Sequence, residues 1–385
     1  MRFEFTDRVQ RVSPSATLAI SSEASRLEAD GIDVVDLSVG EPDFDTPENI
    51  KDAARDALAS GETGYTPSQG IPELREAIAE KLRGDGLDHT ADEVMVTPGG
   101  KQALYEIFQT LTQEGDEVVL LDPAWVSYEA MAKLAGASVS RVDTTPAEFG
   151  LEGVLDELAE TVSDETTLLV VNSPGNPHGM VYSDRALKGV RDLAVDHDFA
   201  VISDEIYKEI TYDGVTQTSL GALSGMADRT ITLNGFSKAY AMTGWRLGYF
   251  AAPEEVIDQA GKVHSHSVSC ATSFVQHAGI EALRNTDQRV AEMRNAFEER
   301  RDLLLDELSS RGVSVPTPKG AFYMMLPVAD DDQAWCEQAI GEAHVATVPG
   351  SAFGTPGYAR VSYANSQKRL LEALSRLEDH DLLAQ

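Results

Sequence analysis

The sequence predicts an α/β fold in which a mainly parallel sheet is covered by helices on both faces and is followed by a smaller α+β domain. Between about residues 90 and 255, short β-rich apolar runs end on polar or glycine residues, and a helical pattern follows each run. From about residue 275 this alternation gives way to one long helical stretch and three short runs. At 385 residues, 42% of them hydrophobic, the chain is long enough to fill two such units.

The elements follow one another along the chain in a consistent order. The first 45 residues hold an amphipathic stretch and the loop Gly40–Asp43, and they could pack on either unit. The runs of the predicted sheet are Glu93–Thr97, Val118–Leu121, Leu168–Val171, Ala200–Ser203, Thr230–Leu233 and Leu247–Ala251. The later elements are the helical stretch through Arg301–Leu308 and the runs Phe322–Leu326, Ala346–Val348 and Arg360–Tyr363. We expect an N-terminal arm over 1–45 that forms part of the small domain, a large domain over 46–275 and a small C-terminal domain over 276–385.

The chain is strongly acidic, with 64 Asp and Glu against 31 Lys and Arg and a formal net charge of −33. The acidic residues are spread along the chain, which is typical of a solvated surface. Such a charge repels phosphate backbones and anionic lipids, so we expect neither nucleic acid nor a membrane as a partner. A composition poor in lysine and rich in acids is typical of proteins from salt-loving organisms, because salt screens the self-repulsion. The composition therefore predicts a halophilic protein.

A few residues indicate the cellular compartment and argue against a metal site. Cys270 and Cys336 are too few for a disulfide framework and indicate a reducing interior. The first residues lack the apolar core of a signal peptide, and no apolar run reaches the roughly 18 residues of a membrane span, so we expect a cytoplasmic protein. His264 and His266 could place two rings on one face of a strand, but without a third ligand we favour solvent-facing or capping histidines and expect no metal.

Chemically unusual residues follow the predicted strands. Ligands of open parallel sheets bind beyond the carboxyl ends of the strands, so these residues are the candidates for a site. In chain order they are Gly99-Gly100-Lys101, Asp122 to Trp125, Asn172 to Gly179, Asp204 to Tyr207, and Asn234 to Lys238. Each also has an ordinary structural interpretation, since paired glycines make tight turns, a strand-ending aspartate caps helices and a tryptophan fills cores.

The segment from Gly235 to Gly248, GFSKAYAMTGWRLG, favours the functional over the structural interpretation of these residues. Lys238 stands among small and apolar neighbours, where desolvation lowers the pKa of an amine and favours attack on an aldehyde. Arg246, eight residues further on, could bind a phosphate on the same ligand. The full string resembles the cofactor attachment site of class I/II aminotransferases, which use pyridoxal 5'-phosphate and have the fold-type I architecture with a seven-stranded-type sheet. The resemblance covers about residues 10–380 and is closest to aspartate aminotransferase-like enzymes of subgroup Iγ.

The resemblance implies a cofactor site. Lys238 would bond the cofactor aldehyde and later move a proton, Asp204 would pair with the ring nitrogen, and Tyr207 would act on the ring oxygen. The implied cofactor-binding residues are Gly99, Gly100, Lys101, Trp125, Asn176, Asp204, Tyr207, Ser237, Lys238, Arg246 and Tyr65.

The resemblance also implies a substrate site and a dimer. Arg360 would hold the α-carboxylate of an amino acid, because a guanidinium matches a planar carboxylate. Gly40, Trp125 and Asn176 would complete the contacts to the substrate. Tyr65 corresponds to a tyrosine that reaches the cofactor phosphate of the neighbouring subunit, so the implied assembly is a homodimer.

Three positions depart from the family pattern. His178 stands where Thr is usual, and it is either a contact to the substrate or an exposed loop residue. Gly235 occupies a site where many relatives carry a phosphate-binding Ser, for which Ser237 would partly substitute. Ser13 stands where several aspartate-active relatives carry a Lys near the distal carboxylate.

The predicted activity is a ping-pong transfer of an amino group between an L-amino acid, with aspartate as the first choice, and 2-oxoglutarate. The same residues leave open an aromatic, alanine or prephenate aminotransferase, and a β-lyase on the same fold. A transcription regulator built on this domain would need an additional DNA-binding segment, for which we see no room in the chain. We find no Gly-x-Ser-x-Gly elbow, P-loop or dinucleotide fingerprint.

Overall fold

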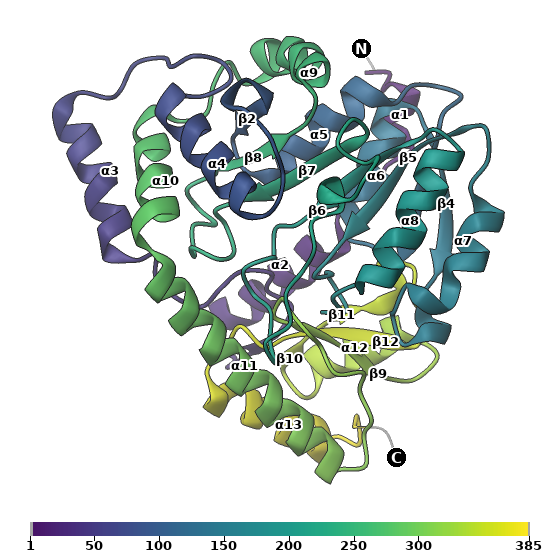
Figure 1. The fold of residues 1–385 in the computed structure, drawn as a ribbon. Helices are drawn as coiled ribbons and strands as arrows, with labels where there is room; N and C mark the ends of the chain where they lie inside the picture. The colour runs from purple at the N-terminus through teal and green to yellow at the C-terminus, as the bar shows by residue number, and fades with distance from the viewer. Residues whose placement is uncertain (1–2, 384–385) are drawn as a thin grey trace.

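A seven-stranded sheet forms the centre of the structure, a computed structural model that describes residues 3–383 (Figure 1). The spatial order is β2-β8-β7-β6-β5-β3-β4. All neighbouring strands are parallel except at β8, which is antiparallel to both β2 and β7. The strands are β2 (Val94–Thr97), β3 (Glu117–Asp122), β4 (Ser138–Asp143), β5 (Thr166–Asn172), β6 (Ala200–Asp204), β7 (Thr230–Gly235) and β8 (Gly248–Ala251).

Helices cover both faces of this sheet because successive side chains of its strands point to opposite sides. In β3, Val118 and Leu120 belong to the apolar cluster formed with α5, α6 and α9, whereas Val119 and Leu121 belong to the cluster formed with α7 and α8. At the β2 end of the sheet a third cluster includes residues of α3, α4 and α10. These helices are α3 (Glu48–Ser60), α4 (Pro72–Gly84), α5 (Gly100–Leu111), α6 (Val126–Ala135), α7 (Leu155–Thr161), α8 (Asp184–Asp196), α9 (Glu254–Ser267) and α10 (Ser273–Asn285).

A second, smaller layer contains the C-terminal residues. Its antiparallel sheet has the order β11-β12-β9, and the short strands β1 and β10 pair in parallel beside it. The long helix α11 leads from the large sheet into this part, where its apolar residues pack with α12 and α13 (Figure 1). The elements are β1 (Val35–Asp36), α11 (Asp287–Ser310), β9 (Tyr323–Pro327), α12 (Asp332–Gly341), β10 (Val345–Ala346), β11 (Val348–Pro349), β12 (Tyr358–Ser362) and α13 (Gln367–Asp379).

The N-terminal residues divide between the two parts. Helix α2 (Ala16–Ala29) buries Ala24 against Ile340 of α12 and Ala346 of β10, so it packs on the smaller part. The short helix α1 (Asp7–Gln10) lies beside α6 of the larger part. Residue 275, the expected end of the large domain, falls inside α10, whose buried residues pack with α3 and α4. The division into domains at these residues stays a prediction.

The structure confirms the predicted fold class, an α/β fold with a mainly parallel sheet, and within residues 3–383 it has three more strands than the nine expected runs. The expected run Ala346–Val348 is divided between β10 and β11. β4 and β1 have no counterpart among the expected runs. The expectation for His264 and His266 is wrong in its local structure, since both lie on helix α9. Across residues 3–383, every helix is too short or too polar to cross a membrane.

Candidate active site

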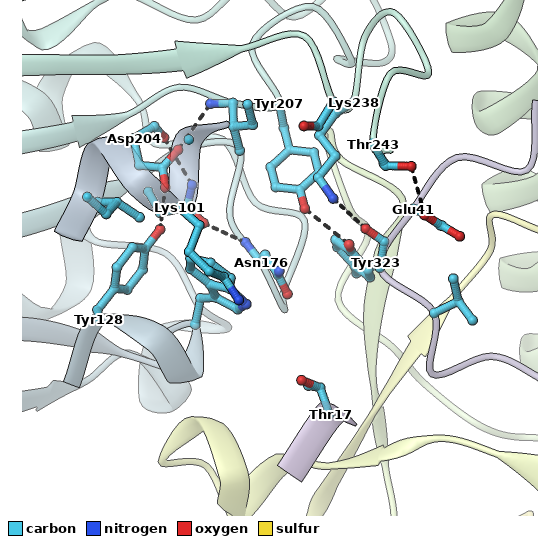
Figure 2. A pocket seen from close by; sticks show the side chains of 18 of the residues that line it. Thr17, Glu41, Lys101, Tyr128, Asn176, Asp204, Tyr207, Lys238, Thr243 and Tyr323 are labelled. Atoms are coloured by element: carbon cyan, nitrogen blue, oxygen red, sulfur yellow. Dashed lines mark hydrogen bonds between the residues drawn. The ribbon is translucent and has the colours of Figure 1, made fainter. Parts of the chain in front are cut away.

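A cavity of about 600 Å³ lies beyond the carboxyl ends of the central strands and is bounded on its other side by α2 and by residues of the smaller part (Figure 2). It brings together most of the residues that the sequence singled out. The predicted residues that line it are Gly40, Gly100, Lys101, Trp125, Asn176, Asp204, Tyr207, Ser237, Lys238, Arg246 and Arg360. Four of the lining side chains are cationic, while Glu41 and Asp204 are the acidic ones, so the cavity favours an anionic ligand.

Lys238 is placed by the reversal of the chain between β7 and β8. Because β8 is antiparallel to β7, the connection leaves and returns at the same edge, where Gly235 pairs with Gly248. The Lys238 Nζ donates a hydrogen bond to the backbone oxygen of Gly40 and lies 5.7 Å from the centre of the Tyr207 ring. Burial, together with the charge of Arg360, lowers the pKa of Lys238 to about 8. The amine is therefore partly neutral near pH 7, as a nucleophile or base requires.

Asp204 ends strand β6 and is 3% exposed. Burial raises the pKa of this carboxyl to about 6. Two donors oppose that effect: the Tyr128 hydroxyl donates to Oδ2 at 2.6 Å, and the Ile206 amide donates to Oδ1 at 3.2 Å (Figure 2). Hydrogen bonds to a carboxylate favour its charged form, so Tyr128 helps to keep a buried negative charge in the cavity.

The start of α5 and Arg246 form one anionic-ligand subsite. Gly99, with φ at +87°, turns the chain so that α5 begins at Gly100, and the first turn of a helix leaves N–H groups without intrahelical partners. A Cβ on Gly99 would lie 2.5 Å from Arg246 Nη2, and one on Gly248 would lie 2.4 Å from Gly100 N. The glycines thus let the helix start, β8 and the guanidinium approach one another closely. The Lys101 ammonium lies 5.0 Å from the centre of the Trp125 ring.

Strand β12 of the small sheet contributes Arg360 to the cavity, and this residue is 2% exposed. Its Nη1 donates to Asn176 Oδ1 at 3.1 Å and its Nη2 donates to Ser38 O at 2.5 Å. Its guanidinium lies 4.6 Å from the centre of the Tyr323 ring. Among the described residues the Arg360 Nε is buried without a hydrogen-bond partner. An unused donor on a buried guanidinium is what a carboxylate ligand would take up.

Two tyrosines in the cavity were missed by the sequence reasoning. Tyr128 holds Asp204, and the hydroxyl of Tyr323 lies 3.0 Å from the hydroxyl of Tyr207. Tyr128 follows Trp125 by three residues, and their rings meet edge to face at 5.4 Å. That spacing places two aromatic rings on one face of a helix and could have found Tyr128. No local pattern marks Tyr323, because it reaches Tyr207 from a strand of the other sheet.

The remaining candidate residues lie outside the cavity or play a different part in it. Tyr65 is 93% exposed and does not line the cavity, and Ser13 is also exposed and away from it. Gly99 lies behind Arg246 rather than on the cavity wall. Gly235 is buried where β7 pairs with β8, and of Gly235 and Ser237 only Ser237 lines the cavity.

The interpretation of His178 as an exposed loop residue is wrong, because its side chain is 3% exposed. The ring stacks between Phe149 and Tyr182, with 6.0 Å between centroids on each side, and Nδ1 accepts a hydrogen bond from the Met180 amide. Burial lowers the pKa of His178 to about 3, so the ring is neutral at ordinary pH. It stands behind Asn176 rather than in the main cavity.

The favoured interpretation of His264 as a solvent-facing or capping residue is also wrong. Its ring is fully buried and its Nδ1 lies 2.9 Å from Oε1 of Glu106 on α5, whereas His266 is exposed. Within residues 3–383, His, Cys, Asp and Glu side chains do not gather in groups of three or more that could hold a metal ion.

Comparisons with known proteins agree with this geometry. The family model described as aminotransferase class I and II matches residues 32–377. An aspartate/prephenate aminotransferase of Thermus thermophilus is 46% identical over 376 residues, which are 96% of this chain and 96% of that protein. An aromatic-amino-acid aminotransferase of Thermococcus litoralis is 41% identical over 383 residues and covers 97% of each chain.

Solved structures show the same relationship in three dimensions. The aspartate aminotransferase from Thermus thermophilus with maleate superposes with a TM-score of 0.94 at 44% identity, over 98% of this chain and 100% of that one. The sequence pattern, the cavity and the comparisons together show that the chain belongs to the class I and II aminotransferases and is a transferase that uses pyridoxal phosphate.

Proposed function

We propose that the enzyme transfers the amino group of aspartate to 2-oxoglutarate, with prephenate as an alternative acceptor. The observation that carries the proposal is the pair of Arg360 and Asn176, which lines the same cavity as Lys238 and has one buried guanidinium donor free among the described residues. Such a clamp suits the α-carboxylate of an amino acid or a 2-oxo acid. The names of the relatives, aspartate/prephenate and aspartate aminotransferases, support the choice of substrates.

The residues of the cavity fit pyridoxal phosphate. When bound, this group supplies an aldehyde that links to amines and a ring that withdraws electrons from the α-carbon of the substrate. Lys238 would hold the aldehyde, and Asp204 would face the ring nitrogen. The turn at Gly99 and Gly100, with Arg246 against it, would hold the phosphate. Trp125 would cover the ring, and Tyr207 would contact the ring oxygen.

The protein contributes position and proton transfer to the reaction. Arg360 and Asn176 fix the carboxylate so that the α-hydrogen faces Lys238. Once the amino group of the substrate had replaced Lys238 on the aldehyde, the freed Lys238 amine, whose pKa is lowered to about 8, would be able to take the proton from the α-carbon and pass it on. Asp204, charged with the help of Tyr128, would stabilise positive charge on the ring nitrogen. A second 2-oxo acid would use the same residues in reverse.

The proposed assembly is a homodimer in which Tyr65 completes the site of the partner. Tyr65 is 93% exposed and is not part of the cavity wall of its own chain. A large aromatic side chain standing in solvent beside an otherwise ordered loop is typical of an interface residue. We assign Tyr65 to the cofactor phosphate of a second copy.

We also propose a finer classification and a setting for the enzyme. The match of Gly40, Trp125, Asn176 and Arg360 to the family pattern supports subgroup Iγ. The excess of 64 acidic over 31 basic residues supports adaptation to high salt, and two free cysteines support a cytoplasmic location.

Replacing Lys238 with Ala tests the central assignment. The variant should lose turnover by several orders of magnitude and lose the visible absorbance of the covalently held cofactor. The matched control is Lys262→Ala, on the exposed side of α9, which should behave as the parent. Turnover at the parental rate by the Lys238 variant would contradict the proposal.

A panel of amino donors and 2-oxo acids tests the substrate. Aspartate with 2-oxoglutarate should give glutamate and oxaloacetate at the highest kcat/KM, and prephenate should compete as an acceptor. A higher kcat/KM with alanine or with aromatic amino acids would replace aspartate in the proposal. Release of pyruvate and ammonia from cysteine without glutamate formation would instead indicate a β-lyase.

A further inference from the structure

We propose that Gln276 is a positioning residue that acts on the active site of the partner subunit, by holding the loop that presents Tyr65. The inference depends on the proposed dimer and on the proposed role of Tyr65. It adds a residue that the sequence pattern did not single out and that lies outside the cavity of its own chain.

Gln276 lies in the first turn of α10 and is completely buried. Its carboxamide uses both ends on the chain that follows Tyr65. Oε1 accepts a hydrogen bond from the Ile71 amide at 2.8 Å, and Nε2 donates to Thr66 Oγ1 at 2.9 Å and to Ala271 O at 3.0 Å. A single buried side chain therefore fixes the residue directly after Tyr65 and the residue at which the loop enters α4.

A second attachment fixes the same loop to the free edge of the large sheet. The Val96 amide of β2 donates to Gln69 O at 3.0 Å. Gly70, with φ at +106°, lies so close to Val96 that a Cβ on the glycine would stand 2.6 Å from Val96 Cγ2. A side chain at position 70 would therefore push the loop away from the sheet, and Gln276 contacts the loop from the other side, with Oε1 3.2 Å from the same Cβ position.

The residues of the loop differ in how far they are exposed to solvent. Residues 61–65 are exposed, Thr66 is half-buried, and Gly70 and Ile71 are buried. Tyr65 thus stands in an exposed stretch between two anchored points, since on its other side the Glu62 backbone oxygen accepts a hydrogen bond from Ser273 Oγ at 2.7 Å. A side chain held this way needs little further ordering when it meets a second copy, and such preorganisation raises affinity without adding contacts.

The first experiment measures the loop in the protein without cofactor. Gln276→Met keeps the size and shape of the side chain and removes its hydrogen bonds. Amide hydrogen exchange of the segment 64–71 should accelerate by about tenfold or more, as expected for the loss of about 1.4 kcal/mol of local stability. The matched control is Gln109→Met on α5, whose buried Nε2 has no partner among the described residues. Unchanged exchange in the Gln276 variant would overturn the proposal.

The second experiment separates an effect on the partner from an effect within one subunit. Lys238→Ala chains are mixed with Gln276→Met chains, and the cofactor concentration for half-maximal turnover is measured. In a mixed dimer the single working site has Lys238 of the Gln276→Met chain and Tyr65 from a chain with intact Gln276. We therefore expect this site to regain the parental cofactor affinity, while the Gln276→Met homodimer is weakened by about tenfold.

Two further variants separate the role of Gln276 from the role of Tyr65. Thr66→Val removes the acceptor of the Gln276 Nε2 bond and should show the same recovery on mixing, even if Gln276→Met folds poorly. Tyr65→Phe mixed in the same way tests the dimer itself. Recovery by the Tyr65 variant without recovery by the other two would overturn the role of Gln276 alone. Failure of the Tyr65 variant to recover would overturn the proposed function of Tyr65.

Discussion

Lys238 carries its charge for only part of the time near neutral pH, because burial and Arg360 lower its pKa to about 8. Only the neutral amine attacks an aldehyde, so the rate of cofactor capture by the cofactor-free protein should rise about tenfold per pH unit below pH 8 and level off above it. Stopped-flow absorbance over this pH range measures the rate. A rate that keeps rising to the ordinary lysine pKa of about 10.4 would contradict the expected effect of burial.

Tyr128 should set the charge of Asp204. The Tyr128 hydroxyl donates to a carboxylate whose pKa burial raises to about 6, and this hydrogen bond opposes the rise. In Tyr128→Phe the pKa of Asp204 should increase further, so that the acidic limb of the kcat profile moves to higher pH by about one unit. Tyr105→Phe, on the neighbouring helix α5, is the control. An unshifted acidic limb in the Tyr128 variant would show that the hydrogen bond does not control the charge.

Single residues also show where sequence reasoning succeeds and where it ends. Lys238, Asp204 and Arg246 were found because strand ends and a long sequence pattern mark them, and the structure brings them to one cavity. Tyr323 was missed because its partner Tyr207 is distant in sequence, in the turn that follows β6 of the other sheet. The exposure of His178 was mispredicted because two aromatic rings enclose it, and one of them, Phe149, is distant in sequence.

At the scale of elements, the contact between β8 and the start of α5 should control cofactor retention. A Cβ at Gly248 would lie 2.4 Å from Gly100 N and 2.6 Å from Gly99 C, which are backbone atoms of the turn. Gly248→Ala should therefore push the turn away from the strand, lower the Tm and weaken cofactor binding by about tenfold or more, because overpacking costs roughly 1–3 kcal/mol. Cofactor titration followed by absorbance tests this.

Gly341→Ala is the control for that substitution. Nothing lies within 4 Å of a Cβ at Gly341, which ends α12. We expect unchanged cofactor affinity and a Tm within a few degrees of the parent. If both variants lost the cofactor to the same degree, the close approach at Gly248 would not be the cause.

The elements themselves were predictable where their pattern was strong. Strands buried on both faces appear as continuous apolar runs, and each of those predicted matches an observed strand of the large sheet. Strand β4, with the sequence SVSRVD, lies at the edge of the sheet and is half-exposed, so its pattern is too polar to stand out. The reversed direction of β8 could not be seen, because an apolar run does not reveal its orientation.

At the scale of the whole molecule, the net charge of −33 should make stability depend on salt. Much of this charge lies on exposed carboxylates such as Asp33, whose pKa is lowered to about 2 by hydrogen bonds from Arg369 and Arg376. At about 1 M salt the screening length falls to roughly 3 Å, and repulsion among the unpaired acids weakens more than these contacts do. We expect the Tm to rise from dilute buffer to molar salt.

Potassium chloride and sodium chloride should act alike if screening is the cause, because screening depends on ionic strength alone. Thermal unfolding followed by circular dichroism measures the Tm in each salt. A Tm that falls with ionic strength would show that attractive ion pairs outweigh the repulsion among acids, and it would remove the support for adaptation to salt.

The residues of the cavity come from two different sheets. Lys238, Arg246 and the start of α5 all belong to the carboxyl edge of the large sheet, whereas Arg360 and Tyr323 belong to the small one. A tilt of the small sheet against the large sheet would therefore change the grip on the substrate and leave the cofactor anchored. A substitution in the small sheet, such as Arg360→Lys, should raise KM for the amino acid while cofactor affinity stays constant. If KM changes in this way, the enzyme would exchange substrates many times over while one cofactor molecule stays in place.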